Sequence, residues 1–143
     1  MKVVQIAVFI ENTPGRVAEV CSLLGDGGIN LRALSMGDST DFGVLRMIVN
    51  NPEGAKQLLK KNGFTAIEAE VVVVEIPDRP GGVAGVLNLL ATQGINVEYM
   101  YMLVTASRGS AYVAFRFTDN DKAIKVLLEN NVRILKGEEV YNI

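Results

Sequence analysis

The sequence has no histidine and no tryptophan, and Cys21 is its only cysteine among 143 residues. The missing histidine removes the commonest side-chain general base and metal ligand, and a single cysteine excludes an internal disulfide. No nucleophile–base pair, metal-ligand cluster or pair of carboxylates occurs at a motif spacing either. We therefore predict a protein that is not an enzyme, with no catalytic residue, no metal and no cofactor.

Long apolar runs and clusters of positive charge are also missing. Apolar runs such as 6–10 and 71–74 fall far short of the roughly 20 residues that a membrane helix requires. The net charge is −2, the isoelectric point is near 5.2, and the 14 basic residues are scattered along the chain. These properties predict a soluble, cytoplasmic protein that binds neither nucleic acid nor membrane.

What the chain does contain is an internal repeat. Residues 12–31 return as residues 78–97 at a constant offset of 66, and 10 of these 20 positions are identical. Such self-similarity indicates a duplicated module. Each copy is too small to bury much core alone, so the two modules, 1–69 and 70–143, are expected to pack against each other. Interfaces of this kind favour small-ligand sites.

Each module follows the order βαββαβ. In the first we expect strands at 3–10, 31–36, 43–49 and 64–69, a turn at 37–41, and helices over 14–25 and from 51 onward. In the second we expect strands at 71–76, 96–105, 111–117 and 134–141, with helices ending near 93 and 130. The predicted fold class is α+β: two ferredoxin-like modules in tandem, with antiparallel sheets and the helices on one face. The bare face should be covered by the other half or by another chain.

The strand-to-helix turn is the feature of each copy that is suited to binding. A short polar residue, Asn12 or Asp78, precedes Pro-Gly there, and an Asn follows 18 residues later, at Asn30 or Asn96. Helix N-termini offer free N–H groups to a carboxylate, and amide side chains both donate and accept, as a free amino acid requires. An Asx residue at a helix start is also a common structural cap, so both interpretations stand at this point.

These paired turns, each followed by a helix and by Gly-Ile-Asn entering a strand, resemble ACT domains, which are amino-acid-binding regulatory modules of βαββαβ fold. The tandem layout is similar to the regulatory protein of the glycine cleavage system, and residues 10–49 resemble the regulatory subunit of acetolactate synthase. The resemblance implies a ligand site made of Asn12, Pro14, Gly15, Arg16, Val17, Asn30, Leu31, Asp78, Pro80, Gly81, Gly82, Val83 and Asn96.

The resemblance also limits the choice of ligand. Serine-binding ACT domains carry a histidine two residues before the turn Asn, where this chain has Ile10 and Ile76, so an apolar amino acid is at least as plausible. Because Asp78 would oppose a ligand carboxylate, we expect the two sites to be unequal, with the ligand on the first turn and the other repeat closing over it. We expect a homodimer. The alternative is a protein-binding regulatory subunit of an enzyme of amino-acid metabolism, of the acetolactate synthase type, with ligand binding lost or secondary.

Three other groups of residues could belong to a functional site, but a structural role is the simpler interpretation for each. Tyr99 and Tyr101 are expected to pack in a core or interface, although they could line a specificity pocket. Arg46 is expected to be solvated or ion-paired rather than to hold a ligand carboxylate. Cys21 is expected to be a small core residue.

Overall fold

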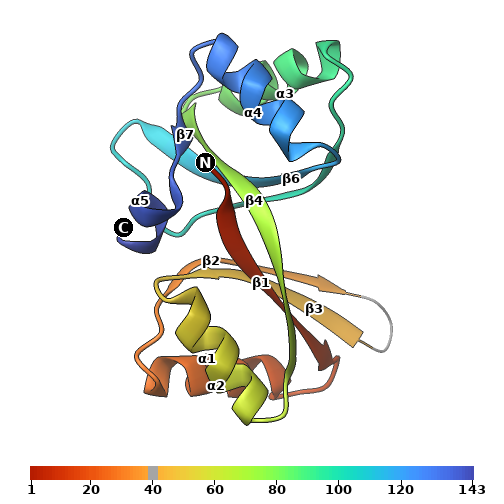
Figure 1. Ribbon diagram of the computed structural model, residues 1–143, viewed down its shortest axis with the longest axis vertical. Coiled ribbons are helices and arrows are strands. Elements are labelled where there is room, and N and C mark those ends of the chain that lie inside the picture. Colours follow the sequence, from red (N-terminus) through yellow and green to blue (C-terminus); the bar gives the residue numbers. More distant parts are fainter. Residues whose placement is uncertain (39–41) are drawn as a thin grey trace.

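The computed structural model describes residues 1–38 and 42–143 of the chain. Figure 1 shows two halves stacked along the long axis of the molecule, each with its pair of helices at the outer end. The first half contains β1 (Val3–Glu11), α1 (Arg16–Asp26), β2 (Leu31–Asp38), β3 (Phe42–Val49), α2 (Pro52–Lys61) and the first part of β4 (Thr65–Pro77). The second half contains the rest of β4, then α3 (Gly82–Thr92), β5 (Val97–Met102), β6 (Ser110–Phe117), α4 (Asn120–Glu129), β7 (Ile134–Leu135) and α5 (Gly137–Tyr141).

The predicted βαββαβ order is present twice, with antiparallel pairing throughout. The sheet order is β2-β3-β1-β4-β6-β5, and β7 pairs with β4. Each half therefore has the ferredoxin-like arrangement, β4-β1-β3-β2 in the first and β7-β4-β6-β5 in the second. The strands β2 and β3 pair as the expected hairpin. Positions 39–41 of its predicted turn lie outside the described residues.

The strand β4 belongs to both halves. Its first part pairs with β1, from Thr65 opposite Phe9 to Val71 opposite Val3. Its second part pairs with β6, beginning with Val72 opposite Phe115. The two strands expected at 64–69 and 71–76 are thus one continuous strand, because no turn residue interrupts the β-branched run. The boundary expected between residues 69 and 70 lies inside it.

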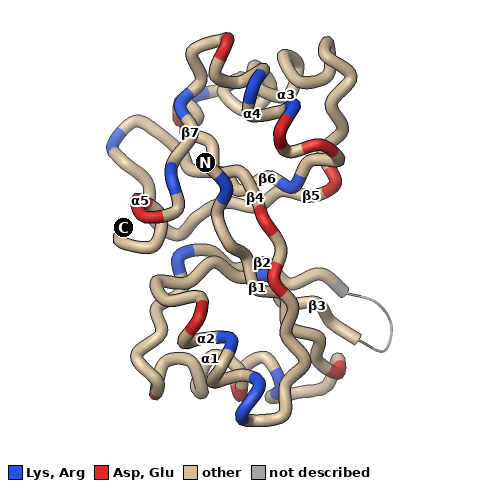
Figure 2. The backbone as a smooth tube through the Cα atoms, viewed as in Figure 1, with Lys and Arg blue, Asp and Glu red and all other residues tan. Residues whose placement is uncertain are grey.

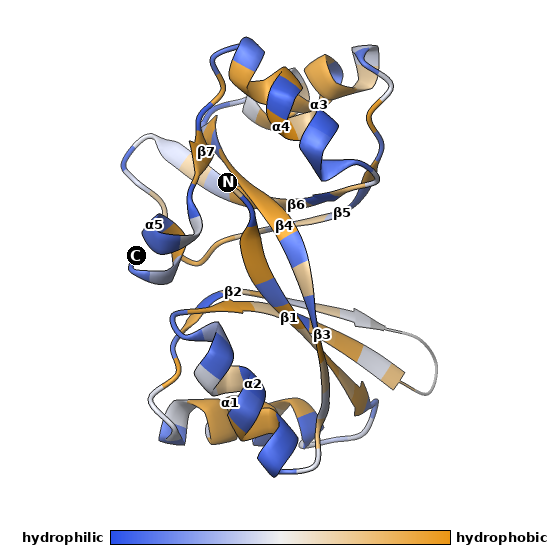
Figure 3. Cartoon of the chain, in the orientation of Figure 1, coloured by the Kyte–Doolittle hydropathy of each residue, from blue (hydrophilic) through white to orange (hydrophobic). Residues whose placement is uncertain are grey.

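Three apolar cores hold this arrangement. In each half one face of the sheet packs against its two helices, through residues such as Ile6 and Leu24 or Val74 and Leu90. The third core lies between the halves, where the helix-free faces meet (Figure 3). Its buried members are Val3, Ala33, Ile48, Val71, Val73, Tyr101, Leu103, Tyr112, Ala114, Leu135 and Val140. The expectation that the bare face is covered by the other half is therefore confirmed.

One polar side chain is fully enclosed in this third region. Gln5, 1% exposed, donates from Nε2 to the hydroxyl of Tyr99 at 2.9 Å, and its Oε1 accepts from the hydroxyl of Tyr101 at 2.6 Å. The Arg46 guanidinium stacks over the Tyr99 ring at 4.0 Å. The tyrosine pair thus has the packing role expected for it. Arg46 was expected to be solvated or ion-paired; it is partly buried, and among the described residues it contacts the Tyr99 ring and has no ion pair.

The end of the chain differs from the prediction. The strand expected over 134–141 is limited to Ile134–Leu135, and α5 follows it. The reason is local: the amide of Lys136 donates to the Glu139 carboxylate at 2.7 Å and so starts a helical turn. That turn buries Val140 completely in the core between the halves. No helix of the described chain is long and apolar enough to cross a membrane.

Candidate functional site

The first predicted turn places an uncapped helix start at the surface. Gly15 is the N-cap of α1 with φ of 88°, a left-handed conformation that suits glycine, and no side chain caps the helix. Asn12 is exposed, and in the described chain its side chain makes no hydrogen bond. The amides of Val17 and Ala18 likewise have no acceptor in that part of the protein. Asn12 is therefore not the structural cap that its sequence position allowed.

Arg16 covers this turn from within its own repeat. Its guanidinium donates to Glu11 at 2.7 Å and to Glu19 at 2.6 Å, and it stacks over the Phe64 ring at 4.8 Å. The two carboxylates raise the pKa of Arg16 by hydrogen bonding. The expectation that the other repeat closes over the first turn is therefore wrong within one chain, because the covering residues come from the same repeat.

Asn30 and Asn12 do not converge on one site in a single chain. Glu11 pairs with Phe42 at one end of β3, and Leu31 pairs with Val49 at the other. Seven strand steps of roughly 3.3 Å separate these ends by about 23 Å. Asn30 instead pairs through its backbone with Asn50, at 2.8 Å and 3.1 Å, and Leu31 packs on the core of its own half.

The second turn repeats the backbone of the first with different side chains. Gly81 is the N-cap of α3 with φ of 84°, again without a side-chain cap. Gly82 stands where the first repeat has Arg16, and a Cβ there would collide with the carbonyl oxygen of Pro77. Asp78 and Pro80 are exposed, Val83 packs against the core of its half, and Asn96 lies near Thr118 at 3.4 Å.

The two turns also lie far from each other. The first follows the end of β1 that pairs with Thr65, and the second follows Pro77, at the opposite end of β4. Twelve strand steps of about 3.3 Å put them roughly 40 Å apart. The predicted site residues therefore do not form one site in a single chain: the two turns are separate surface regions, and Asn30 lies about 23 Å from the first of them.

A pocket that the sequence did not reveal lies beside the second turn. It has a volume of about 450 Å³, which is in the range of small-ligand sites. Pro77, Val86 and Val132 form apolar wall, while Ser110 and Asn131 add polar groups.

A charged pair completes this pocket, which we call the β4-end pocket. Glu75 and Arg133 line it, with Nη1 of Arg133 3.2 Å from the Glu75 carboxylate. Partial burial raises the pKa of Glu75, but hydrogen bonds from Arg133, Ser107 and Ser110 outweigh it and hold that pKa below its ordinary value. The carboxylate is therefore ionised at neutral pH. The pocket thus contains one negative and one positive side chain, which together complement the two charges of a zwitterion.

The first repeat carries larger side chains at two equivalent positions. Phe64, 8% exposed, occupies the position of Val132, and Arg16 lies over its ring. In the second repeat the smaller Val132 lines the pocket, and Gly82 replaces Arg16 in the turn beside it. The sequence contained a signal for this difference. The offset between the repeats is 68 residues at this point, so Phe64 aligns with Val132, which has no aromatic ring.

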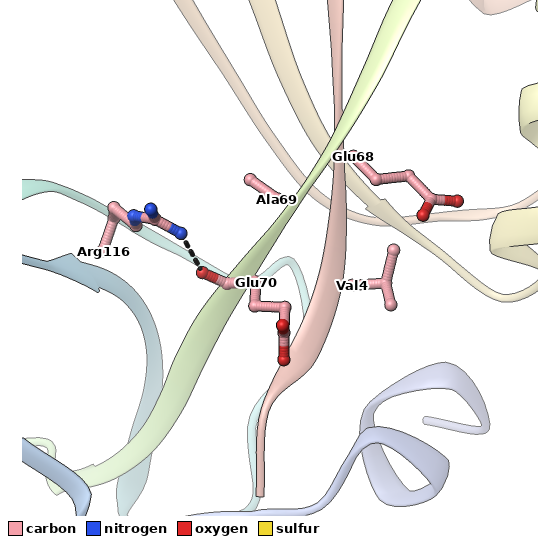
Figure 4. Close-up of a pocket in the computed structure, with 5 residues that line it drawn as sticks. All are labelled: Val4, Glu68, Ala69, Glu70 and Arg116. Atoms are coloured by element: carbon pink, nitrogen blue, oxygen red, sulfur yellow. Dashed lines mark hydrogen bonds between the residues drawn. The ribbon is translucent and has the colours of Figure 1, made fainter. Parts of the chain in front are cut away.

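A further pocket, of about 380 Å³, lies where the halves join (Figure 4). Val4, Glu68, Ala69, Glu70 and Arg116 line it. Arg116 reaches the backbone carbonyl of Glu70 at 2.9 Å, and Glu68 points away from it. Glu68 also pairs with Lys56 at 3.0 Å. The charges of this pocket therefore do not face a common centre.

The outer edges of the sheet carry exposed apolar side chains. On β2 these are Leu34 and Met36, and the same positions of the second repeat hold Met100 and Met102. Met102 is 58% exposed. Lys, Arg, Asp and Glu are spread over both halves in Figure 2 rather than gathered into one stripe. Cys21 is partly buried, and that burial raises the pKa of its thiol, as expected of a packing residue.

Comparisons with known proteins agree with this architecture. The model of a family described as "ACT domain pair" matches residues 1–143. A crystal structure of a protein from Bacteroides thetaiotaomicron is 38% identical, has a TM-score of 0.93, and is aligned over 100% of this chain and 98% of its own. No curated protein matches.

More distant structures share the fold. The ligand-free regulatory subunit of aspartate kinase from Thermus thermophilus is 20% identical with a TM-score of 0.66, over 88% of this chain and 91% of its own. The corresponding subunit from Thermus flavus is 19% identical with a TM-score of 0.61, over 88% and 90%. The structural relatives thus include regulatory subunits with a similar arrangement.

Proposed function

Because the chain belongs to the family of ACT domain pairs, we propose that it is a non-catalytic regulatory protein of the cytoplasm that binds a free amino acid. Its two modules correspond to residues 1–69 and 70–143. Binding changes how the modules associate with another copy or with a partner protein. A coupling of about 1 to 3 kcal/mol is sufficient for such regulation.

One observation carries this proposal: two helices begin at the surface without a cap. Both Gly15 and Gly81 are left-handed N-caps, and Asn12 and Asp78 leave their side chains free of hydrogen bonds within the described residues. Since orphan N–H groups at a helix start favour an anion, a ligand carboxylate fits the first turn, whereas the Asp78 carboxylate opposes it at the second. The free Asn12 amide adds a group that can donate to it as well.

A site that uses both Asn12 and Asn30 requires a second copy of the chain, because about 23 Å of β3 separates them in one copy. The exposed Leu34 and Met36 on the outer edge of β2 favour such an association. We therefore propose a homodimer. Light scattering should give twice the monomer mass, and Met36→Glu should shift it towards the monomer.

A thermal-shift panel of the twenty amino acids tests ligand binding. A ligand at about a hundredfold over its dissociation constant adds roughly 2.7 kcal/mol and raises the melting temperature by several degrees. Asn12→Ala should reduce the shift, whereas the matched variant Asn88→Ala, at an exposed position of α3, should retain it in full. If none of the twenty amino acids changes the melting temperature, the amino-acid part of the proposal is refuted.

A second function is favoured by the exposed apolar edge of the other repeat. Met102 is 58% exposed and Val104 is 74% exposed. Such a surface fits a partner protein, so the alternative is a regulatory subunit of an enzyme of amino-acid metabolism. A stoichiometric enzyme recovered with the protein from native extract, and lost with Met102→Glu, would favour this alternative.

A further inference from the structure

One residue of the β4-end pocket, Arg133, also forms an ion pair with the C-terminal helix α5. Nη2 of Arg133 is 2.7 Å from Glu139 of α5, while Nη1 contacts Glu75 in the pocket. Arg133 therefore bridges two carboxylates, one on the pocket wall and one on α5. Both pairs are partly exposed, with side-chain exposures of 51% for Arg133 and 38% for Glu139, so each is weak enough for a ligand to replace.

On its other side, α5 is attached to the first half. The hydroxyl of Tyr141 accepts the amide of Val4 at 2.8 Å, and its carbonyl oxygen accepts Nε of Arg32 at 3.1 Å. Val140 is completely buried in the core between the halves. Figure 1 shows α5 beside the junction of the two halves. This short helix thus connects the β4-end pocket with β1 and β2 of the other repeat.

The pocket walls match a small aliphatic α-amino acid. The Glu75 carboxylate can receive the ligand ammonium, Arg133 can receive the carboxylate, and Val86 and Val132 provide apolar contact for the side chain. A carboxylate prefers two parallel N–H groups of one guanidinium. Every such pair on Arg133 includes Nη1 or Nη2, which already donate to Glu75 and Glu139. Because Glu75 holds the ammonium, Glu139 is the partner that leaves.

We propose that the β4-end pocket binds an aliphatic amino acid and that α5 reports its occupancy, because the ligand carboxylate takes Arg133 from Glu139. This inference rests on the proposed function for the class of ligand, and it adds the pocket as a second site beside the one at the first turn. Ligand binding then loosens α5 and weakens its hold on β1 and β2. The second repeat senses and the first repeat responds.

Binding is tested by calorimetry with L-valine, L-leucine and L-isoleucine on the full chain. Arg133→Gln should weaken binding by about tenfold or more, as expected for a lost charge-assisted hydrogen bond. The matched variant Arg108→Gln removes an exposed arginine with no partner in the described residues and should bind normally. Val132→Phe restores the ring of the first repeat and should block the pocket without changing a charge. Isoamylamine, which lacks the carboxylate of leucine, should not bind.

Hydrogen exchange tests the response of α5. Ligand should speed exchange of the amides of residues 137–143, and Glu139→Gln should show that faster exchange without ligand. Slower or unchanged exchange on binding overturns the coupling. Binding that survives both Arg133→Gln and Val132→Phe but is lost in Asn12→Ala overturns the inference and leaves the proposed function standing. Binding of none of the twenty amino acids removes both.

Discussion

The hydrogen bond between Tyr101 and Gln5 gives a direct test of how the halves are held together. Gln5 is 1% exposed, and its amide oxygen accepts from the Tyr101 hydroxyl at 2.6 Å. Tyr101→Phe keeps the ring and removes that donor, leaving a buried acceptor without its partner. Such a loss costs about 1 to 3 kcal/mol. For a chain of this size, about 2 kcal/mol lowers the melting temperature by roughly 6 °C.

Thermal and urea unfolding followed by circular dichroism measure this change. Tyr99→Phe is the matched control, because Tyr99 is only partly buried and water can replace its hydroxyl as the partner of Gln5. The double variant Gln5→Leu/Tyr101→Phe removes both partners and should lose less stability than the two single variants together. A Tyr101→Phe variant within about 0.5 kcal/mol of the parent protein would refute the reasoning.

Further predictions concern pH and backbone. Burial raises the pKa of the Tyr101 hydroxyl, so the folded state keeps a proton that unfolded tyrosine loses near pH 10, and the free energy of unfolding should fall above about pH 10, less steeply in Tyr101→Phe. The lowered pKa of Glu75 gives stability that is lost as pH falls below about 4.5, and Arg133→Gln should reduce this loss in acid urea titrations. Gly81→Ala should cost about 1 kcal/mol because φ is 84°, whereas Gly85→Ala, with open space inside α3, should stabilise by about 0.5 to 1 kcal/mol in the same assay.

The repeat and the apolar periodicity were sufficient to predict the fold, because both report on the same duplicated core. The predicted helix limits at 14, 25, 51, 93 and 130 lie within about two residues of the observed ones, since Pro, Gly and Asn mark these ends. The chain end was not predicted correctly. Ile134 and Leu135 favour a strand and Val140 and Tyr141 resemble its continuation, whereas the helical turn depends on the Glu139 carboxylate and on burial of Val140 against the other half.

The location of the site residues was harder to predict. The two repeats have the same spacing between turn and Asn, but this spacing does not place those residues in one site. In a strand–helix–strand unit with parallel strands, the first strand ends at one end of the sheet and the second strand begins at the other end. This geometry separates Asn12 from Asn30 and was already implied by the predicted βαββαβ order. The β4-end pocket could not be predicted for a different reason. Val132 lacks the ring that Phe64 has in the first repeat, and the importance of that ring is visible only in the structure, where it packs under Arg16.

The shared strand also limits how a bound ligand can act on the molecule. A hinge between the halves would have to break β4, whose ladders to β1 and β6 meet between Val71 and Val72 without a gap. The core between the halves further opposes a rotation, since Val71 and Val73 of the same strand are fully buried in it. Motion is therefore easiest in elements that add few strand pairs. The short β7 has two pairs with β4, and α5 follows it directly. A signal that starts at the outer end of β4 thus reaches the first half through the C-terminal segment at lower cost than through the sheet.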